Sequence, residues 1–248
     1  MFLTNYADIF QHKYTIITSV TCLIIPYYAW RSLFKYREQL KQFLAEEQVF
    51  VERHNCVITY KANEGISGWF PNKNLMAPRA EKIYEDLYAP VIYFIQTARH
   101  TLDVAFMLIS VNLIYVELVK AKRRGVKVRI LCNFAHIEGC RDQISSLIRE
   151  GIEYQFFIGT SSSMDTIMHH KFMVKDYDER TGEGFLCTGS MNFTSTSPTN
   201  NYEMLVFNTN RNVVKSFSDN FEECWNDVKL DNEGLINKTI LMDAQFDS

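Results

Sequence analysis

The residues with the clearest chemical potential lie at positions 169–176, which follow the pattern His-x-Lys-x4-Asp. In a β-strand alternate side chains lie on one face, so we expect His169 and Lys171 to project together. An imidazole beside an ammonium suits attack on a phosphate. The histidine supplies a nucleophile or a proton, and the lysine neutralises the phosphate oxygens. The pattern therefore predicts phosphoryl chemistry.

Further polar residues follow on the next two expected strands. Ser190 and Asn192, in a Gly-Ser-x-Asn sequence, share one face and offer hydrogen-bond donors to the same phosphate. Glu203 lies one strand later, where its carboxylate is expected to hold the His169 ring in one tautomer. A basic surface strand with a capping aspartate is the alternative for the first pattern alone.

Together the two patterns resemble the signature of the phospholipase D superfamily, and the resemblance covers most of the chain after about residue 80. With one copy of the motif and an N-terminal anchor, the chain looks most like the mitochondrial phospholipase D subfamily, called Zucchini or mitochondrial cardiolipin hydrolase. The gap before Gly-Ser-x-Asn is longer than in the family, and we expect residues 177–184 to form a hairpin loop. The resemblance implies six roles: His169 as nucleophile through a phosphohistidine, Lys171 and Asn192 as phosphate ligands, Ser190 as their helper, Glu203 as the residue that orients His169, and Asp176 as a supporting site residue.

Superfamily chemistry takes two such motifs per active site, and this chain has one. Strand alternation directs His170 away from His169. The remaining histidines, His12, His54, His100 and His136, lack a lysine two residues on. A two-fold homodimer that shares one site resolves the shortage. Two such imidazoles predict a bell-shaped pH dependence.

No metal or cofactor is expected, because Lys171, Asn192 and the second histidine supply the charge stabilisation. The subfamily often carries a zinc knuckle. In that region this chain has His54 and Cys56, too few for four closely spaced ligands. We expect both to be ordinary loop or strand residues.

The N-terminal segment is expected to be a membrane anchor. Residues 14–30 carry no charge and reach the short end of the length that spans a bilayer. More basic residues follow this segment than precede it, which places the rest of the chain in the cytosol. The alternative is a signal peptide or a buried helix. By resemblance the membrane is the mitochondrial outer membrane, with a single pass; the sequence alone leaves the endoplasmic reticulum open.

The 248 residues have room for one substantial α/β domain with appendages, and a net charge of −3 gives no global attraction to nucleic acid. We expect a mixed β-sheet with helices on both faces, in a phospholipase D-like arrangement. The six scattered cysteines predict reduced thiols. The expected organisation is a short segment 1–13, the anchor 14–30, an amphipathic helix 31–50, the catalytic domain 51–229 and a polar tail 230–248. The expected helices are 78–100, 112–124, 137–150 and 212–228; the expected strands are 102–109, 126–132, 153–158, 168–175, 184–190 and 203–208.

Two phosphodiester substrates compete, single-stranded RNA and an anionic phospholipid such as cardiolipin. Trp69, Phe70 and Lys73 are candidates to stack on bases or to enter lipid headgroups. The basic run at 120–124 could contact RNA, although a charged helix end explains it equally. The resemblance implies an endonuclease of piRNA biogenesis, which we favour. The alternatives are a cardiolipin hydrolase that produces phosphatidic acid and a non-catalytic membrane tether.

Overall fold

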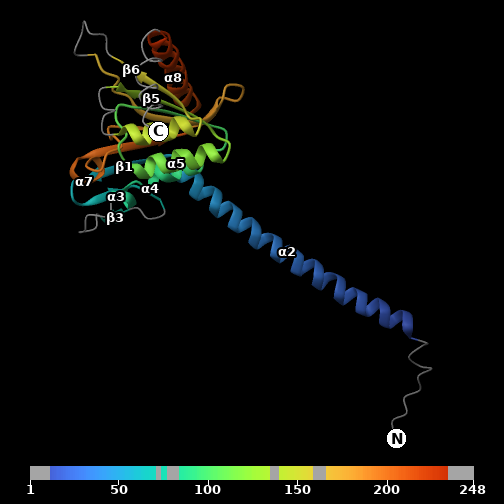
Figure 1. Cartoon of the computed structure of the whole chain (residues 1–248). Coiled ribbons are helices and arrows are strands. Elements are labelled where there is room, and N and C mark those ends of the chain that lie inside the picture. The colour runs from blue at the N-terminus through green and yellow to red at the C-terminus, as the bar shows by residue number, and fades with distance from the viewer. Residues whose placement is uncertain (1–11, 71–73, 77–83, 135–139, 159–165, 234–248) are drawn as a thin grey trace. The chain divides into compact units, whose positions relative to one another are not determined.

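The computed structural model describes residues 12–70, 74–76, 84–134, 140–158 and 166–233 (Figure 1). The chain forms two compact units, residues 1–50 and residues 51–248. Several expected features lie outside the described residues: most of the short N-terminal segment, Lys73, the start of the helix expected from residue 78, His136 and most of the polar tail.

The first unit is formed by helix α2, Lys13–Arg53, which continues into the start of the second unit. The expected anchor and the expected amphipathic helix are thus parts of one helix, which contains Pro26. Most of its large apolar side chains are exposed. Among the residues that the structure describes, no helix is both long and apolar enough to cross a membrane. The anchor stays a prediction.

The second unit is built on a mixed sheet with the strand order β3-β2-β1-β9-β8-β7-β4-β5-β6. The pairs β4–β5 and β5–β6 are parallel and the other neighbours are antiparallel. The strands are β1 Cys56–Lys61, β2 Gly65–Ser67, β3 Asn74–Met76, β4 Thr101–Phe106, β5 Lys127–Asn133, β6 Glu153–Phe157, β7 Lys171–Asp178, β8 Glu183–Gly189 and β9 Glu203–Asn208.

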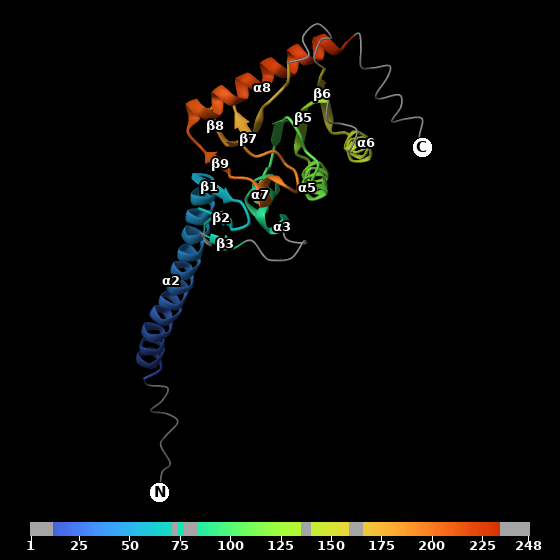
Figure 2. The same ribbon diagram turned by 90° about the vertical axis from the view of Figure 1, so that its left-hand side faces the viewer.

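Helices cover both faces of this sheet, as expected (Figures 1 and 2). Helix α8 packs on β6, β7 and β8 and closes one apolar core, whereas α5 packs on β5 within the core on the other face. The expected α/β class is confirmed. The helices of this unit are α3 Tyr84–Leu87, α4 Ala89–Gln96, α5 Asn112–Arg123, α6 Arg141–Arg149, α7 Ser197–Asn200 and α8 Arg211–Asn232.

The central strand β7 is apolar on both faces, since both cores need it. Phe172 and Val174 pack in the core under α8, and Met173 packs in the opposite core. Lys171 and Lys175 are the exceptions, and both are buried. The expected hairpin after β7 is confirmed, because Asp178 pairs with Glu183 across the turn.

Candidate active site

The candidate site lies at one edge of the sheet, where β7 and β9 begin and β4 and β8 end. Lys171 is paired with Phe106, and Gly189 with Leu205. We call this the site edge. At the opposite edge, Lys175 is paired with Leu102. Strand direction thus brings together residues that are far apart in the sequence.

His169 and Lys171 lie together, as the alternation predicted. Lys171 Nζ is 3.1 Å from His169 Nε2 and donates to the His169 carbonyl oxygen at 3.2 Å. His169 comes just before β7 and is exposed, whereas Lys171 is 8% exposed. An accessible ring nitrogen thus contacts a shielded cation, an arrangement suited to a phosphate that approaches both groups.

Burial lowers the pKa of Lys171, because the charged ammonium loses hydration there. The Glu203 carboxylate opposes this shift and favours the ammonium. The interaction places Glu203 in the electrostatic environment of the His169–Lys171 pair.

Glu203 is held by neighbours other than the predicted one. Ser190 Oγ donates a short hydrogen bond to one carboxylate oxygen, and Asn201 Nδ2 donates to the other at 3.0 Å. Met204 N–H in turn donates to Ser190 Oγ at 3.1 Å. In the described contacts of this chain, no hydrogen bond joins Glu203 to His169. Sequence reasoning missed Asn201, although it stands two residues before Glu203.

Asn192 shares a direction with Ser190, as predicted, since Met191 and Phe193 point inward and are completely buried. Asn192 Oδ1 is buried and has no hydrogen-bond partner among the described residues. Its backbone is fixed, because Tyr88 donates its hydroxyl to the Asn192 carbonyl at 3.3 Å. The amide group is therefore positioned but not saturated.

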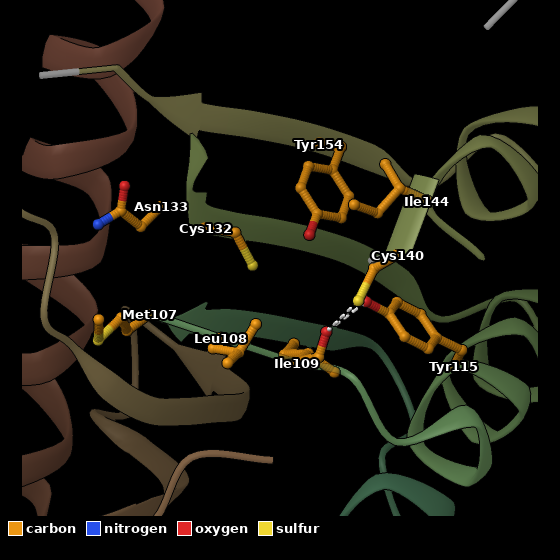
Figure 3. A pocket seen from close by; sticks show the side chains of 9 residues that line it. All are labelled: Met107, Leu108, Ile109, Tyr115, Cys132, Asn133, Cys140, Ile144 and Tyr154. Atoms are coloured by element: carbon orange, nitrogen blue, oxygen red, sulfur yellow. Dashed lines mark hydrogen bonds between the residues drawn. The ribbon is translucent and has the colours of Figure 1, made fainter. Parts of the chain in front are cut away.

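A small cavity of about 10 Å³ lies at the ends of β4 and β5 (Figure 3). Residues that line it hold the neighbouring loop in place. The Tyr115 hydroxyl donates to the Ile109 carbonyl at 2.6 Å, and Cys140 Sγ points to the same oxygen at 3.3 Å. Ser110 N–H then donates to the Phe193 carbonyl at 2.8 Å, next to Asn192. This support combines distant segments and carries no sequence signature.

Asp176 does not lie at the site edge, in contrast to its expected supporting role in the site. Its carboxylate accepts the backbone N–H groups of Arg99, His100 and Thr101 at 2.6–3.1 Å. Its φ is +52°, a conformation that aspartate tolerates better than most residues. Asp176 lies five residues after Lys171 along β7, at the opposite edge, where it caps the start of β4.

His170 is directed away from His169, as expected. Its ring packs against Phe172 with the centroids 5.4 Å apart. Burial lowers the pKa of His170, and the nearby His169 and Lys171 lower it further. His170 is therefore a neutral packing residue.

His54 and Cys56 lie at the entry of the chain into the sheet. Cys56 begins β1, and His54 Nε2 is 2.7 Å from Lys175 Nζ in the interior. Within the described part of the chain, no three His, Cys, Asp or Glu side chains form a group that could hold a metal ion.

The residues expected to contact bases or headgroups are placed differently. Trp69 is 5% exposed and lies under the Arg53 guanidinium, 4.9 Å from its ring centroid, so it cannot stack on a base. The expected role of Trp69 was wrong. Lys120 pairs with Glu117 at 2.8 Å, and Arg123 pairs with Glu150. Two of the four cations in this run are therefore paired with carboxylates, which is consistent with a charged helix end.

Comparison with known families decides the class of the protein. The family described as "Cardiolipin synthase, PLD-like domain" matches residues 91–225, which include the His-Lys pair and Glu203. The chain belongs to this phospholipase D-like family. It is a phosphodiesterase, and the expected enzyme class is confirmed at this level.

Curated relatives within the superfamily are mitochondrial cardiolipin hydrolases. The protein of Xenopus tropicalis is 22% identical over 156 residues, 63% of this chain and 68% of its own length. That of Homo sapiens is 28% identical over 130 residues, 52% of this chain and 46% of its own length. The chain thus spans less than half of the human relative.

Two solved structures are also similar to this chain. The family member Nuc from Salmonella typhimurium is 26% identical, with a TM-score of 0.45 over 55% of this chain and 84% of that chain. NucT from Helicobacter pylori is 17% identical, with a TM-score of 0.47 over 57% of this chain and 90% of that chain.

Proposed function

We propose that this chain hydrolyses phosphodiesters through a phosphohistidine on His169, without a metal, in a site shared by two copies of the chain. The observation that carries the proposal is the exposed His169 Nε2, 3.1 Å from the buried Lys171 ammonium. A side chain fixed in this way is preorganised for a negatively charged group.

In the first step, the substrate phosphate takes the place of His169 Nε2 as acceptor of the Lys171 N–H. The Nε2 lone pair is then free to attack phosphorus, and the P–N bond forms as the P–O bond to the leaving group breaks. Asn192 donates to a phosphate oxygen from its side-chain NH₂ group. Ser190, which is hydrogen-bonded to Glu203, supports binding of the same phosphate.

The leaving oxygen needs a proton, and among the described residues of one chain no second histidine faces the site to donate it. His170 packs on Phe172, and His54 is buried against Lys175. In the proposed homodimer, His169 of the partner subunit donates this proton. It then takes one from water as the water oxygen attacks the phosphohistidine, which restores both imidazoles.

The sequence alone favoured RNA, but the exposed apolar side chains around the site lead us to propose an anionic phospholipid diester such as cardiolipin as the preferred substrate. Exposed apolar side chains flank the site residues: Tyr202 is 77% exposed, Met204 47% and Ile167 50%. Side chains of this kind can enter a lipid surface while the catalytic pair reaches the headgroup. The relatives named cardiolipin hydrolases act on such a lipid, and the product would be phosphatidic acid.

Single-stranded RNA, with a role in piRNA processing, is the second candidate. One observation favours it: the ring of Tyr202, beside Glu203, is exposed and can stack on a base. We also propose that the segment 14–30 anchors the chain in the mitochondrial outer membrane, with the domain 51–229 in the cytosol and a polar tail after it.

Full-length protein in EDTA, given cardiolipin liposomes and labelled single-stranded RNA in parallel, tests these proposals. We expect His169→Asn to lose about 10³-fold or more in turnover. His100→Asn serves as the matched control, because this exposed histidine lies at the opposite edge. Turnover on neither substrate by the wild type would favour the tether instead.

A further inference from the structure

Lys175 is a buried cation that the proposed mechanism does not use. Its side chain is completely shielded from solvent. Its Nζ atom donates to the Phe94 carbonyl at 3.1 Å and to Thr97 Oγ1, and it lies 2.7 Å from His54 Nε2. A lysine is almost never buried unless it is paired, so this position needs a physical reason.

The contact with His54 joins two segments that are distant in the sequence. His54 follows helix α2 and leads into β1, whereas Lys175 lies on β7, four residues after Lys171. The His54 ring is also packed against Phe185, with centroids 4.7 Å apart. The segment through which the chain enters the second unit is thus fixed to the strand that carries the catalytic pair.

The contact depends on protons. A hydrogen bond between Nζ and Nε2 requires that one of the two nitrogen atoms offer a lone pair. If the lysine and the histidine are both in their cationic forms, two positively charged donors face each other across 2.7 Å in the interior. The contact therefore tolerates one positive charge on the pair but not two.

The charged and titratable groups that act on Lys175 lie on more than one element. Burial lowers the pKa of Lys175 to about 7; Asp176 and Cys187 oppose the shift, and Arg99 adds to it. Burial raises the pKa of the Cys56 thiol to about 11 and that of the Cys187 thiol above the usual range, so both thiols stay neutral.

We propose that His54 and Lys175 are positioning residues that form a proton-dependent latch, which holds β7 against the entry segment and thereby fixes the geometry of His169 and Lys171. Lys171 and Lys175 are about 13 Å apart along the strand. A strand held firmly at Lys175 presents its other end in one register. When both latch residues are protonated, this restraint is lost. The latch rests on the proposed roles of His169 and Lys171.

Amide hydrogen exchange of the full-length protein tests the latch without reference to activity. Protection of the β7 amides at 172–174 is expected to fall about tenfold in the wild type between pH 7 and pH 5, after correction for intrinsic rates. In His54→Gln, an amide oxygen accepts from Lys175 at either pH, so protection is expected to stay constant. His100→Gln is the control and should behave as the wild type.

Turnover provides the second readout. Lys175→Met keeps the length of the side chain but removes the latch, and we expect kcat to fall about 10- to 100-fold with KM within about twofold. The acid limb of the pH profile should move to lower pH in His54→Gln and not in His100→Gln.

The same pH dependence of protection in His54→Gln and the wild type would overturn the latch, as would an unchanged kcat in Lys175→Met. Should Lys175→Met not fold, the comparison of His54→Gln with the wild type decides alone. If the wild type has no turnover, the proposed function fails, while hydrogen exchange still tests the latch.

Discussion

Single residues at the site edge have separate electrostatic tasks. The Lys171 ammonium is shielded and its pKa is lowered by burial, whereas Glu203 acts against that shift. Without this carboxylate, the ammonium would be lost at a lower pH. Glu203 therefore protects the charge of Lys171 as well as holding Ser190.

This balance predicts the effect of Glu203→Gln on the pH profile. The lysine must be charged to bind phosphate, so activity falls as the pH rises through its pKa. Removal of the carboxylate lowers that pKa further. The fall in kcat/KM that follows loss of the ammonium, beyond the limb set by the two imidazoles, should therefore begin at lower pH. Glu183→Gln, a change in an exposed residue at the opposite edge, is the control. An unmoved limb in Glu203→Gln would contradict this coupling.

Asp176 has a structural task. In Asp176→Ala the N–H groups of residues 99–101 lose their acceptor, and a positive φ falls on alanine. We expect a loss of about 2–3 kcal/mol in the free energy of unfolding by urea. Asp176→Asn keeps an amide oxygen and tolerates this φ, so its loss should be smaller. If Asp176→Ala kept its stability and lost turnover, the residue would belong to the site.

At the scale of elements, the strands and helices with clear periodicity were predictable, and short or irregular ones were not. The strand β9 has the expected bounds, and α5 differs from expectation by one residue. The strands β1, β2 and β3 were missed. Two of them have three residues each, too few for an alternating pattern to stand out.

The candidate site was predictable where neighbours along a strand decide it. His169 with Lys171, and Ser190 with Asn192, follow from alternation alone. The partners of Glu203, Asp176 and Lys175 depend on strand order and register. These are set by the packing of the whole sheet, so no local pattern contains them.

Substitutions at two glycines distinguish steric crowding from backbone strain as causes of lower stability. A Cβ on Gly189 would lie 2.0 Å from the Met204 carbonyl oxygen, and one on Gly125 meets nothing within 4 Å. Gly125 has a φ of +93°. We expect Gly125→Ala to cost about 1 kcal/mol through strain. Gly189→Ala should cost more, up to about 3 kcal/mol, and force β8 and β9 apart.

The activities of the two variants should differ as well. Separation of β8 from β9 moves Ser190 away from Glu203, so Gly189→Ala should lose turnover at temperatures where it remains folded. Thermal melts and initial rates measure both effects. Equal turnover in the folded forms of both variants would show that the Ser190–Glu203 contact is dispensable.

At the scale of the whole molecule, the proposed shared site makes activity depend on both copies. A dimer of one wild-type chain and one His169→Asn chain has a single usable imidazole. When equal amounts are refolded together, random pairing leaves about one quarter of the dimers fully wild type. Activity should fall to about one quarter of the activity of an equal total amount of wild-type chains. A fall to one half would indicate independent sites.

The positions of chain entry and site within the second unit have one more consequence. His54, where the chain enters the second unit, lies beside Lys175, and the proposed catalytic pair lies at the start of the same strand. If residues 14–30 anchor the chain, as proposed above, another anchoring segment can replace residues 1–50 without changing the proposed site. Such a replacement would move the protein to a different membrane, and removal of residues 1–50 would release it.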